Sequence, residues 1–227
     1  MALCFCHTQH TVYRRRPWKE LGDYLRDGLI VAAASVAAEE HRASVLEREY
    51  IPNNWKGRKV DIVVQSGTSS SPKIITAVEL KWWRRDDGGN SSNRRREIVV
   101  DFLRMAALAP CVEVAGFVAL LSTMSSWQKT TGTTCTDKAV MDLIKSAGVQ
   151  RWDVRGMRNC AAIRAAISEL SGQVPICNIF YSELLSIHAL TQSKQTIAVA
   201  HVWRIHKRQN SKFLKDDVVE KLVERKK

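Results

Sequence analysis

The segment KIITAVELKWW, residues 73–83, most constrains what this chain can fold into. Its β-branched and aromatic residues predict a strand that belongs in a core. Glu79 and Lys81 nevertheless lie inside it. Alternate side chains of a strand share a face, so Glu79 and Lys81 point the same way. Val78 and Leu80 point the other way, and we expect those two to face the core.

A second embedded charge precedes this segment. Asp61 lies within RKVDIVVQ, residues 58–65, another β-branched run, and the stretch SGTSSSP that follows has the composition of a loop. The two runs predict a hairpin that turns near residues 69–70. That register brings Asp61 opposite residues 77–79 and close to Glu79, because directly opposed residues lie about 5 Å apart. Two carboxylates and one lysine are expected to converge at one end of the hairpin.

These three side chains need a partner in an apolar setting. Like charges repel, and a desolvated carboxylate is unfavourable unless it is neutralised. A divalent cation such as Mg²⁺ prefers carboxylate oxygens and keeps several waters. It can polarise a phosphodiester and lower the pKa of a bound water, while a nearby lysine assists the water or the transition state. The net charge of +12 and the pI of about 9.7 independently favour a nucleic-acid partner.

The pattern of Asp61 followed by Glu79-Leu80-Lys81 resembles the PD-(D/E)xK nuclease superfamily. The similarity covers residues 21–122, in the order helix, strand with Asp, strand with ExK, helix, strand. It implies a restriction-endonuclease-like α/β fold in which Asp61 and Glu79 bind Mg²⁺, or Mn²⁺, and Lys81 serves the water or the transition state. Many members add an acid from the first helix. Glu39 and Glu40 are the candidates, and Glu40 is favoured because it follows Val36 by four residues on the apolar face.

The remaining pattern predicts one mixed α/β domain over residues 1–227, a central sheet flanked by helices, with a nuclease-like core at about 18–125. The strand at 112–122 is apolar throughout, so we expect it to be central and covered on both faces. Residues 125–136 are expected to form a polar loop. Residues 175–188 fit either a strand or a helix. The other expected elements are helices at 18–49, 94–109, 137–147, 157–170 and 214–227, and a strand at 196–207.

Basic and aromatic residues flank the candidate site. The candidates for nucleic-acid contacts are Trp82, Arg84, Arg85, Arg94, Arg95 and Arg96. Cations at a helix start oppose the helix dipole, so phosphate contact would explain the arginine triplet. The alternative is that one tryptophan belongs to the core and the arginines form a solvated face. Basic residues at 14–19 and 206–215 stay open between phosphate contacts and solvated tails, and no role is assigned to His188, His201 or His206.

Cysteine usage and hydropathy give the expected compartment. The six cysteines form no CxxC pair, which is typical of reduced intracellular cysteine. The spacing of CFCHTQH, residues 4–10, does not fit a zinc site. No apolar run reaches the roughly 18 residues of a membrane helix. We therefore expect a cytoplasmic or nucleoid-associated protein without a membrane partner. The resemblance allows a homodimer, although the sequence carries no oligomer signal.

The sequence thus predicts a Mg²⁺-dependent endonuclease that hydrolyses nucleic acid, with DNA favoured over RNA. One alternative is a catalytically silent nucleic-acid-binding module on the same fold, and another is a basic structural or assembly subunit.

Each candidate residue also has a simpler interpretation. Glu79 and Lys81 would then face solvent on an edge strand, and Asp61 would pair with Arg58 or Lys59 at the surface.

Overall fold

The computed structural model describes residues 44–66, 73–83, 90–108, 115–134, 136–192, 195–207 and 211–224. They form a seven-stranded sheet and five helices and belong to one compact unit, Ala43–Lys227. The mixed α/β class is therefore confirmed. The expected helix over 18–43 and the candidate acid Glu40 lie outside the described residues. A single domain over the whole chain stays a prediction.

The sheet has the strand order β1-β2-β3-β4-β7-β6-β5. The β3–β4 pair is parallel, and every other neighbouring pair is antiparallel. Parallel neighbours need a crossover connection, which helix α2 supplies between β3 and β4. The strands are β1 Ser44–Tyr50, β2 Val60–Ser66, β3 Lys73–Trp83, β4 Ala115–Thr123, β5 Gly148–Asp153, β6 Ile179–Gln192 and β7 Gln195–His206.

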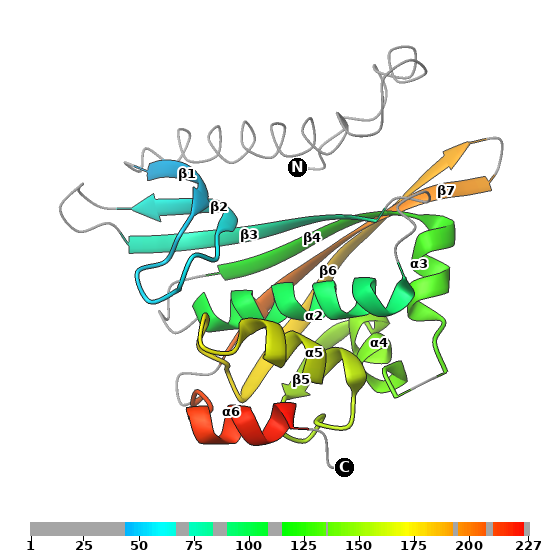
Figure 1. Cartoon of the computed structure of the whole chain (residues 1–227). Helices are drawn as coiled ribbons and strands as arrows, with labels where there is room; N and C mark the ends of the chain where they lie inside the picture. Colours follow the sequence, from blue (N-terminus) through cyan, green and yellow to red (C-terminus); the bar gives the residue numbers. More distant parts are fainter. Residues whose placement is uncertain are drawn as a thin grey trace. The chain divides into compact units, whose positions relative to one another are not determined.

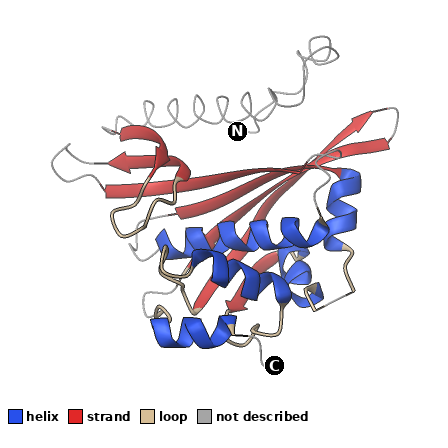
Figure 2. Ribbon diagram, viewed as in Figure 1, coloured by secondary structure: helices blue, strands red, loops and turns tan. Residues whose placement is uncertain are grey.

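The described helices all lie on one face of this sheet (Figures 1 and 2). Helix α2 contacts β3, β4 and β7, and α5 packs against α2. Because α2 is enclosed between the sheet and α5, all of its residues from Ile98 onward are buried, charged ones included. The helices are α2 Ser91–Leu108, α3 Met124–Thr131, α4 Lys138–Lys145, α5 Ala161–Leu170 and α6 Asp216–Val223.

Aromatic residues hold α2 onto the sheet. Phe102 of α2 lies 5.5 Å from Trp203 of β7 and 5.2 Å from Trp152 of β5, measured between ring centroids. All three side chains are fully buried. Edge-on and tilted aromatic pairs of this kind contribute about 0.5–1.5 kcal/mol each beyond their buried area. The helix that carries part of the candidate site is thus fixed firmly in place.

The predicted helix at 18–49 is wrong over its last residues. Residues 44–50 form strand β1, which pairs antiparallel with β2. This pairing gives β2 a neighbour on its outer side, and such tertiary pairing overrides a local helical pattern.

The expected loop at 125–136 is also partly wrong, because Met124–Thr131 forms helix α3. Thr123 caps this helix, its Oγ1 accepting a hydrogen bond from the Ser126 backbone N–H at 3.3 Å. Trp127 packs on His201 and Trp203, which supplies the apolar contact that a polar helix needs.

The remaining strands agree with the sequence to different degrees. The hairpin and the strand at 73–83 are confirmed, residues 179–192 resolve as a strand, and β5 was not predicted. Strand β4 is central, as expected, but its residues alternate between buried, such as Val118, and half-buried, such as Phe117. Among the described elements, helices cover only one of its faces (Figure 2). None of the described helices is long and apolar enough to cross a membrane.

Candidate functional site

The hairpin brings the first two predicted residues together. Strand β2 pairs with β3 so that Ile62 lies opposite Val78 and Val63 opposite Ala77. One residue further along, Asp61 comes level with Glu79, as the sequence predicted. The Asp61 carboxylate accepts a hydrogen bond from the Leu80 backbone N–H, with Oδ2 and N 2.7 Å apart. This bond ties the start of β2 to the strand that carries the ExK residues.

The acid and the base lie on the core face of the sheet. Glu79 and Lys81 share a face of β3 with Ala77 and Trp83, which are both buried beneath the helices. Val78 and Leu80 are half-buried on the opposite face, so the expectation that these two point into the core is wrong. The helices cover the face that carries the charges, because α2 packs there and supplies charged partners. The reading of Glu79 as a solvent-facing residue on an edge strand is likewise excluded, since Glu79 is 3 % exposed and β3 is internal.

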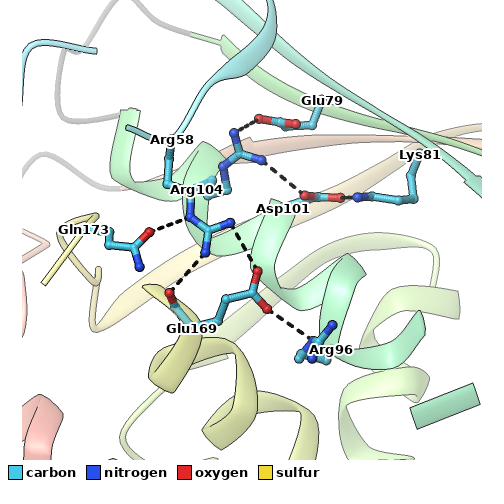
Figure 3. A network of polar contacts seen from close by, with 8 residues as sticks. All are labelled: Arg58, Glu79, Lys81, Arg96, Asp101, Arg104, Glu169 and Gln173. Carbon is cyan, nitrogen blue, oxygen red and sulfur yellow. Dashed lines mark hydrogen bonds and ion pairs between the residues drawn. The ribbon is translucent and has the colours of Figure 1, made fainter. Parts of the chain in front are cut away.

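Two residues of α2 complete the site, and neither was predicted from the sequence. Arg104 Nη2 lies 2.9 Å from Glu79 Oε1, and Asp101 Oδ2 lies 3.1 Å from Lys81 Nζ. Asp101 Oδ1 and Arg104 Nη1 are 3.6 Å apart, one helical turn along α2. Negative and positive groups therefore alternate in the order Glu79, Arg104, Asp101, Lys81 (Figure 3). A single helix turn contacts both ends of the ExK motif.

Burial dominates the electrostatics of the acids. It raises the pKa of Glu79 well above its ordinary value, and the neighbouring carboxylates of Asp101 and Asp61 raise it further, while Arg104 and Lys81 oppose the shift. Burial also raises the pKa of Asp101, and the lysine and arginine beside it only partly offset this. Burial and the proximity of like charges therefore disfavour the ionised forms of both acids.

Lys81 behaves differently from the acids. Burial acts to lower its pKa, but the ion pair with Asp101 and the charge of Glu79 outweigh that effect, so the pKa of Lys81 is raised. The ammonium is therefore held in its charged form. Its side chain is 26 % exposed, whereas that of Asp101 is 2 % exposed. Lys81 and the half-buried Asp61 are the parts of the site that a substrate could reach.

The site carries more acidic than basic groups. Three carboxylates, Asp61, Glu79 and Asp101, face two cations, Lys81 and Arg104, which leaves one excess negative charge when all are ionised. Glu79 Oε1 is fully buried, and no hydrogen bond satisfies it despite the close guanidinium. Within the described part of the chain, no cluster of three or more His, Cys, Asp or Glu residues is arranged to hold a metal. Binding of Mg²⁺ by Asp61 and Glu79 therefore stays a prediction.

A second ion network joins α2, α5 and the loop before β2. Glu169 of α5 lies 3.4 Å from Arg58 Nη1 through Oε1 and 3.2 Å from Arg96 Nε through Oε2. Arg58 also donates to Gln173 Oε1 at 2.6 Å (Figure 3). Arg58 therefore pairs with Glu169 and not with Asp61. Both arginines are about one third exposed, so each retains access to solvent.

The predicted nucleic-acid residues divide into three groups. Arg84 and Arg85 lie outside the described residues. Trp82 is half-buried on the sheet face opposite Lys81, while Trp83 is buried and stacks on Trp127, so the two tryptophans separate as strand alternation predicts. The arginine triplet Arg94–Arg96 is the third group.

The triplet Arg94–Arg96 is mostly internal. Arg94 and Arg95 are buried, and Arg95 Nε donates to Asp137 Oδ2 at 2.9 Å, which ties α2 to the start of α4. Asp137 also accepts from the Ala162 backbone N–H at 2.8 Å. Arg95 thus has a structural partner that the sequence did not reveal. Arg96 is the member of the triplet that faces solvent.

His201, to which no role was assigned, is a core residue. It is 3 % exposed and stacks on Trp127 with ring centroids 3.9 Å apart, with Trp203 on the same strand at 5.4 Å. Burial lowers its pKa to about 4, so the ring is neutral at physiological pH. The aromatic contacts and the neutral state indicate a packing role.

Comparison with known proteins identifies no relative: no family model matches the chain, and searches of curated proteins and of solved structures give no significant match.

Proposed function

We propose that this chain is a metal-dependent endonuclease that hydrolyses phosphodiester bonds of nucleic acid, with DNA favoured over RNA. One observation carries the proposal. The β2–β3 hairpin places Asp61 level with Glu79 on the face that also carries Lys81. The order of the elements supports it: the strand with Asp, the strand with ExK, a helix and a strand parallel to the second follow one another as in the resemblance to the PD-(D/E)xK superfamily. The finer, restriction-endonuclease-like description of the fold belongs to this proposal.

The site residues take distinct roles in this proposal. Asp61 and Glu79 would hold Mg²⁺ or Mn²⁺, which when bound lowers the pKa of a water and shields the leaving oxygen. Lys81 would stabilise the charge that develops on the phosphate or orient the attacking water. Its ion pair with Asp101 keeps the ammonium charged and holds it in place. Glu40 remains the expected additional acid.

Substrate binding follows from the charge of the chain. With a net charge of +12, the protein would attract the phosphate backbone and release its counterions. Among the described residues, Arg58 and Arg96 suit phosphate contacts, because they are partly exposed and held in place by Glu169. Trp82, Arg84 and Arg85 stay predicted contacts. Arg94 and Arg95 are buried, and Arg95 is engaged by Asp137 inside the fold, so neither is offered as a phosphate contact here.

A second candidate function also has support. Arg104 and Lys81 already neutralise much of the negative charge of Glu79 and Asp101. This pairing favours a nucleic-acid-binding module in which the acids serve the fold. The two functions differ in two ways. The nuclease needs a divalent cation and cleaves the nucleic acid, whereas the binding module needs no cation and leaves the nucleic acid intact.

The experiment is a cleavage assay with purified full-length chain. Supercoiled plasmid, linear duplex, single-stranded and branched DNA, and RNA are each incubated with EDTA, Mg²⁺ or Mn²⁺. The Glu79→Gln variant is compared with Glu220→Gln, a matched change at an exposed residue of α6. Metal-dependent cutting that Glu79→Gln abolishes and Glu220→Gln retains supports the nuclease. Salt-sensitive binding without any cutting supports the binding module.

A further inference from the structure

The β6–β7 hairpin has an outer half that the rest of the sheet does not cover. Strand β6 is 14 residues long, and β5 pairs only with its first part, up to Leu184. From Leu185 to Gln192 the outer edge of β6 has no strand partner among the described residues. This half of the hairpin projects beyond the helices at one end of the sheet (Figure 1). We call residues 185–192 with 195–199 the β6–β7 arm.

The composition of the arm is unusual for an open strand edge. Residues 185–192 read LSIHALTQ and contain no Asp, Glu, Lys, Arg or Pro, although 26 % of the chain is charged. Natural proteins protect free edges with charges or prolines, because an unpaired edge is a template for another strand. The arm also concentrates exposed apolar side chains. Of the seven large hydrophobic residues exposed in the described part of the chain, four belong to it: Leu185, Ile187, Leu190 and Ile197.

The two irregularities of this hairpin delimit the segment that can accept a strand. The register between β6 and β7 shifts between Leu184 and Ser186 and again between Leu190 and Thr191. Between them, residues 186–190 pair regularly with residues 198–202. Bulges twist and interrupt an edge, so the regular stretch between them is the usable one. Its five residues match the usual length of a strand in a globular protein.

We propose that this edge pairs with the same edge of a second copy of the chain, which joins two sheets across a twofold axis. A twofold axis brings an edge strand and its copy together in antiparallel orientation, so the backbone groups of each edge pair with those of the other. Twofold dimers are also the commonest oligomers. The distribution of charge favours such an occupant over a phosphate backbone. Each chain carries a net charge of +12, so two copies repel except where the contact is uncharged. Residues 185–192 supply that uncharged contact, and without Lys or Arg they offer nothing to a phosphate backbone. The inference does not depend on the proposed nuclease activity.

The experiment measures the molar mass of the full-length chain by sedimentation equilibrium over a range of protein and salt concentrations. The test variants are Ile187→Lys and, separately, Leu190→Lys. The matched control is Ile51→Lys, which places the same charge on an apolar side chain of similar exposure, 44 %, outside the arm. All three positions are exposed, and far-UV circular dichroism confirms that each variant is folded.

The wild type and Ile51→Lys are expected to dimerise, and to do so more tightly as salt screens the repulsion between the two basic chains. Each arm variant is expected to raise the dimer dissociation constant roughly tenfold or more, because its lysine enters the interface twice. A monomeric wild type overturns the proposal. A dimer that both arm variants leave intact overturns it as well, because association then uses another surface.

Discussion

Arg104 Nη2 lies 2.9 Å from Glu79 Oε1, so the acid of the ExK motif is neutralised by an arginine one helical turn after Asp101, the partner of Lys81. Both guanidinium and carboxylate are almost completely buried. The Arg104 guanidinium also lies over the ring of Trp55, 5.6 Å from its centroid. The fold therefore depends on a charged residue that a purely catalytic account of the motif would not require.

Replacing Arg104 with Met is expected to destabilise the protein by about 3–5 kcal/mol, because it leaves Glu79 and Asp101 buried with one cation fewer. Urea unfolding at neutral pH measures the change. Adding Glu79→Gln to this variant is expected to restore part of the loss, since the uncompensated acid is then removed. The control Arg151→Met, at an exposed residue of β5, is expected to stay within about 0.5 kcal/mol of wild type. An Arg104→Met variant as stable as the control would show that the ion pair contributes nothing.

Under the proposed nuclease function, Asp101→Asn is expected to lower kcat for phosphodiester cleavage by about a hundredfold and to leave KM nearly unchanged. Asp101 is too buried to touch a substrate, so it would act by holding the Lys81 ammonium in place, and a small misplacement of a catalytic group has effects of this size. Steady-state cleavage kinetics provide the measurement. Asp142→Asn, at a partly exposed ion pair of α4, is the control. An unchanged kcat in Asp101→Asn would contradict the positioning role.

His201 gives a prediction about pH. Its pKa is about 4 in the folded protein and about 6.5 when exposed, so the folded state binds fewer protons between these values. Its contribution to stability is therefore complete above pH 6.5 and is lost as the pH falls toward 4, by about 3 kcal/mol in total. His201→Phe preserves an aromatic ring between the tryptophans and cannot be protonated. The stability difference between variant and wild type, from urea unfolding at pH 7 and at pH 4.5, is expected to shift in favour of the variant on acidification. A pH-independent difference would show that His201 is not buried in the neutral form.

Arg58 and Arg96 are expected to contribute to the salt dependence of duplex DNA binding. Each alanine substitution should reduce the slope of log K against log salt by about 0.9, the value for one phosphate contact. Arg151→Ala removes an exposed, ion-paired arginine from β5 and serves as the control. Fluorescence anisotropy with a labelled duplex at several salt concentrations gives the slopes. Equal slopes for all three variants would show that neither Arg58 nor Arg96 contacts a DNA phosphate.

The strand pattern made the hairpin predictable from sequence. Alternating β-branched residues around Asp61 and Glu79 determined both strands, and a turn centred near residues 69–70 determined the register. Which face the helices cover was not predictable. Val78 and Leu80 are more apolar than Glu79 and Lys81, so hydropathy alone assigned the core to the wrong face. The charged face is buried because α2 brings Asp101 and Arg104 to meet it, and that match depends on tertiary packing.

Asp101 and Arg104 did leave a signal in the sequence. Both lie inside the otherwise apolar run of residues 98–108, all of which are buried. A charged residue in such a run indicates a buried partner of opposite charge. Ile98, Phe102 and Met105 recur at helical spacing and indicate one buried face of this helix. Asp101 and Arg104 are internal because they face Lys81 and Glu79 of β3, and α5 packs against α2 as well. The strand that these two charges meet could not be read from the helix sequence alone.

The most direct test of the central claim is the rate at which supercoiled plasmid is nicked in Mg²⁺ by wild type, by Lys81→Met and by Lys129→Met. The last variant removes a lysine from an exposed position of α3 and leaves the site intact. Wild type and Lys129→Met are expected to nick the plasmid and to stop with EDTA, and Lys81→Met is expected to be at least about a hundredfold slower. Equal nicking by all three, or none by wild type with either Mg²⁺ or Mn²⁺, would contradict the central claim.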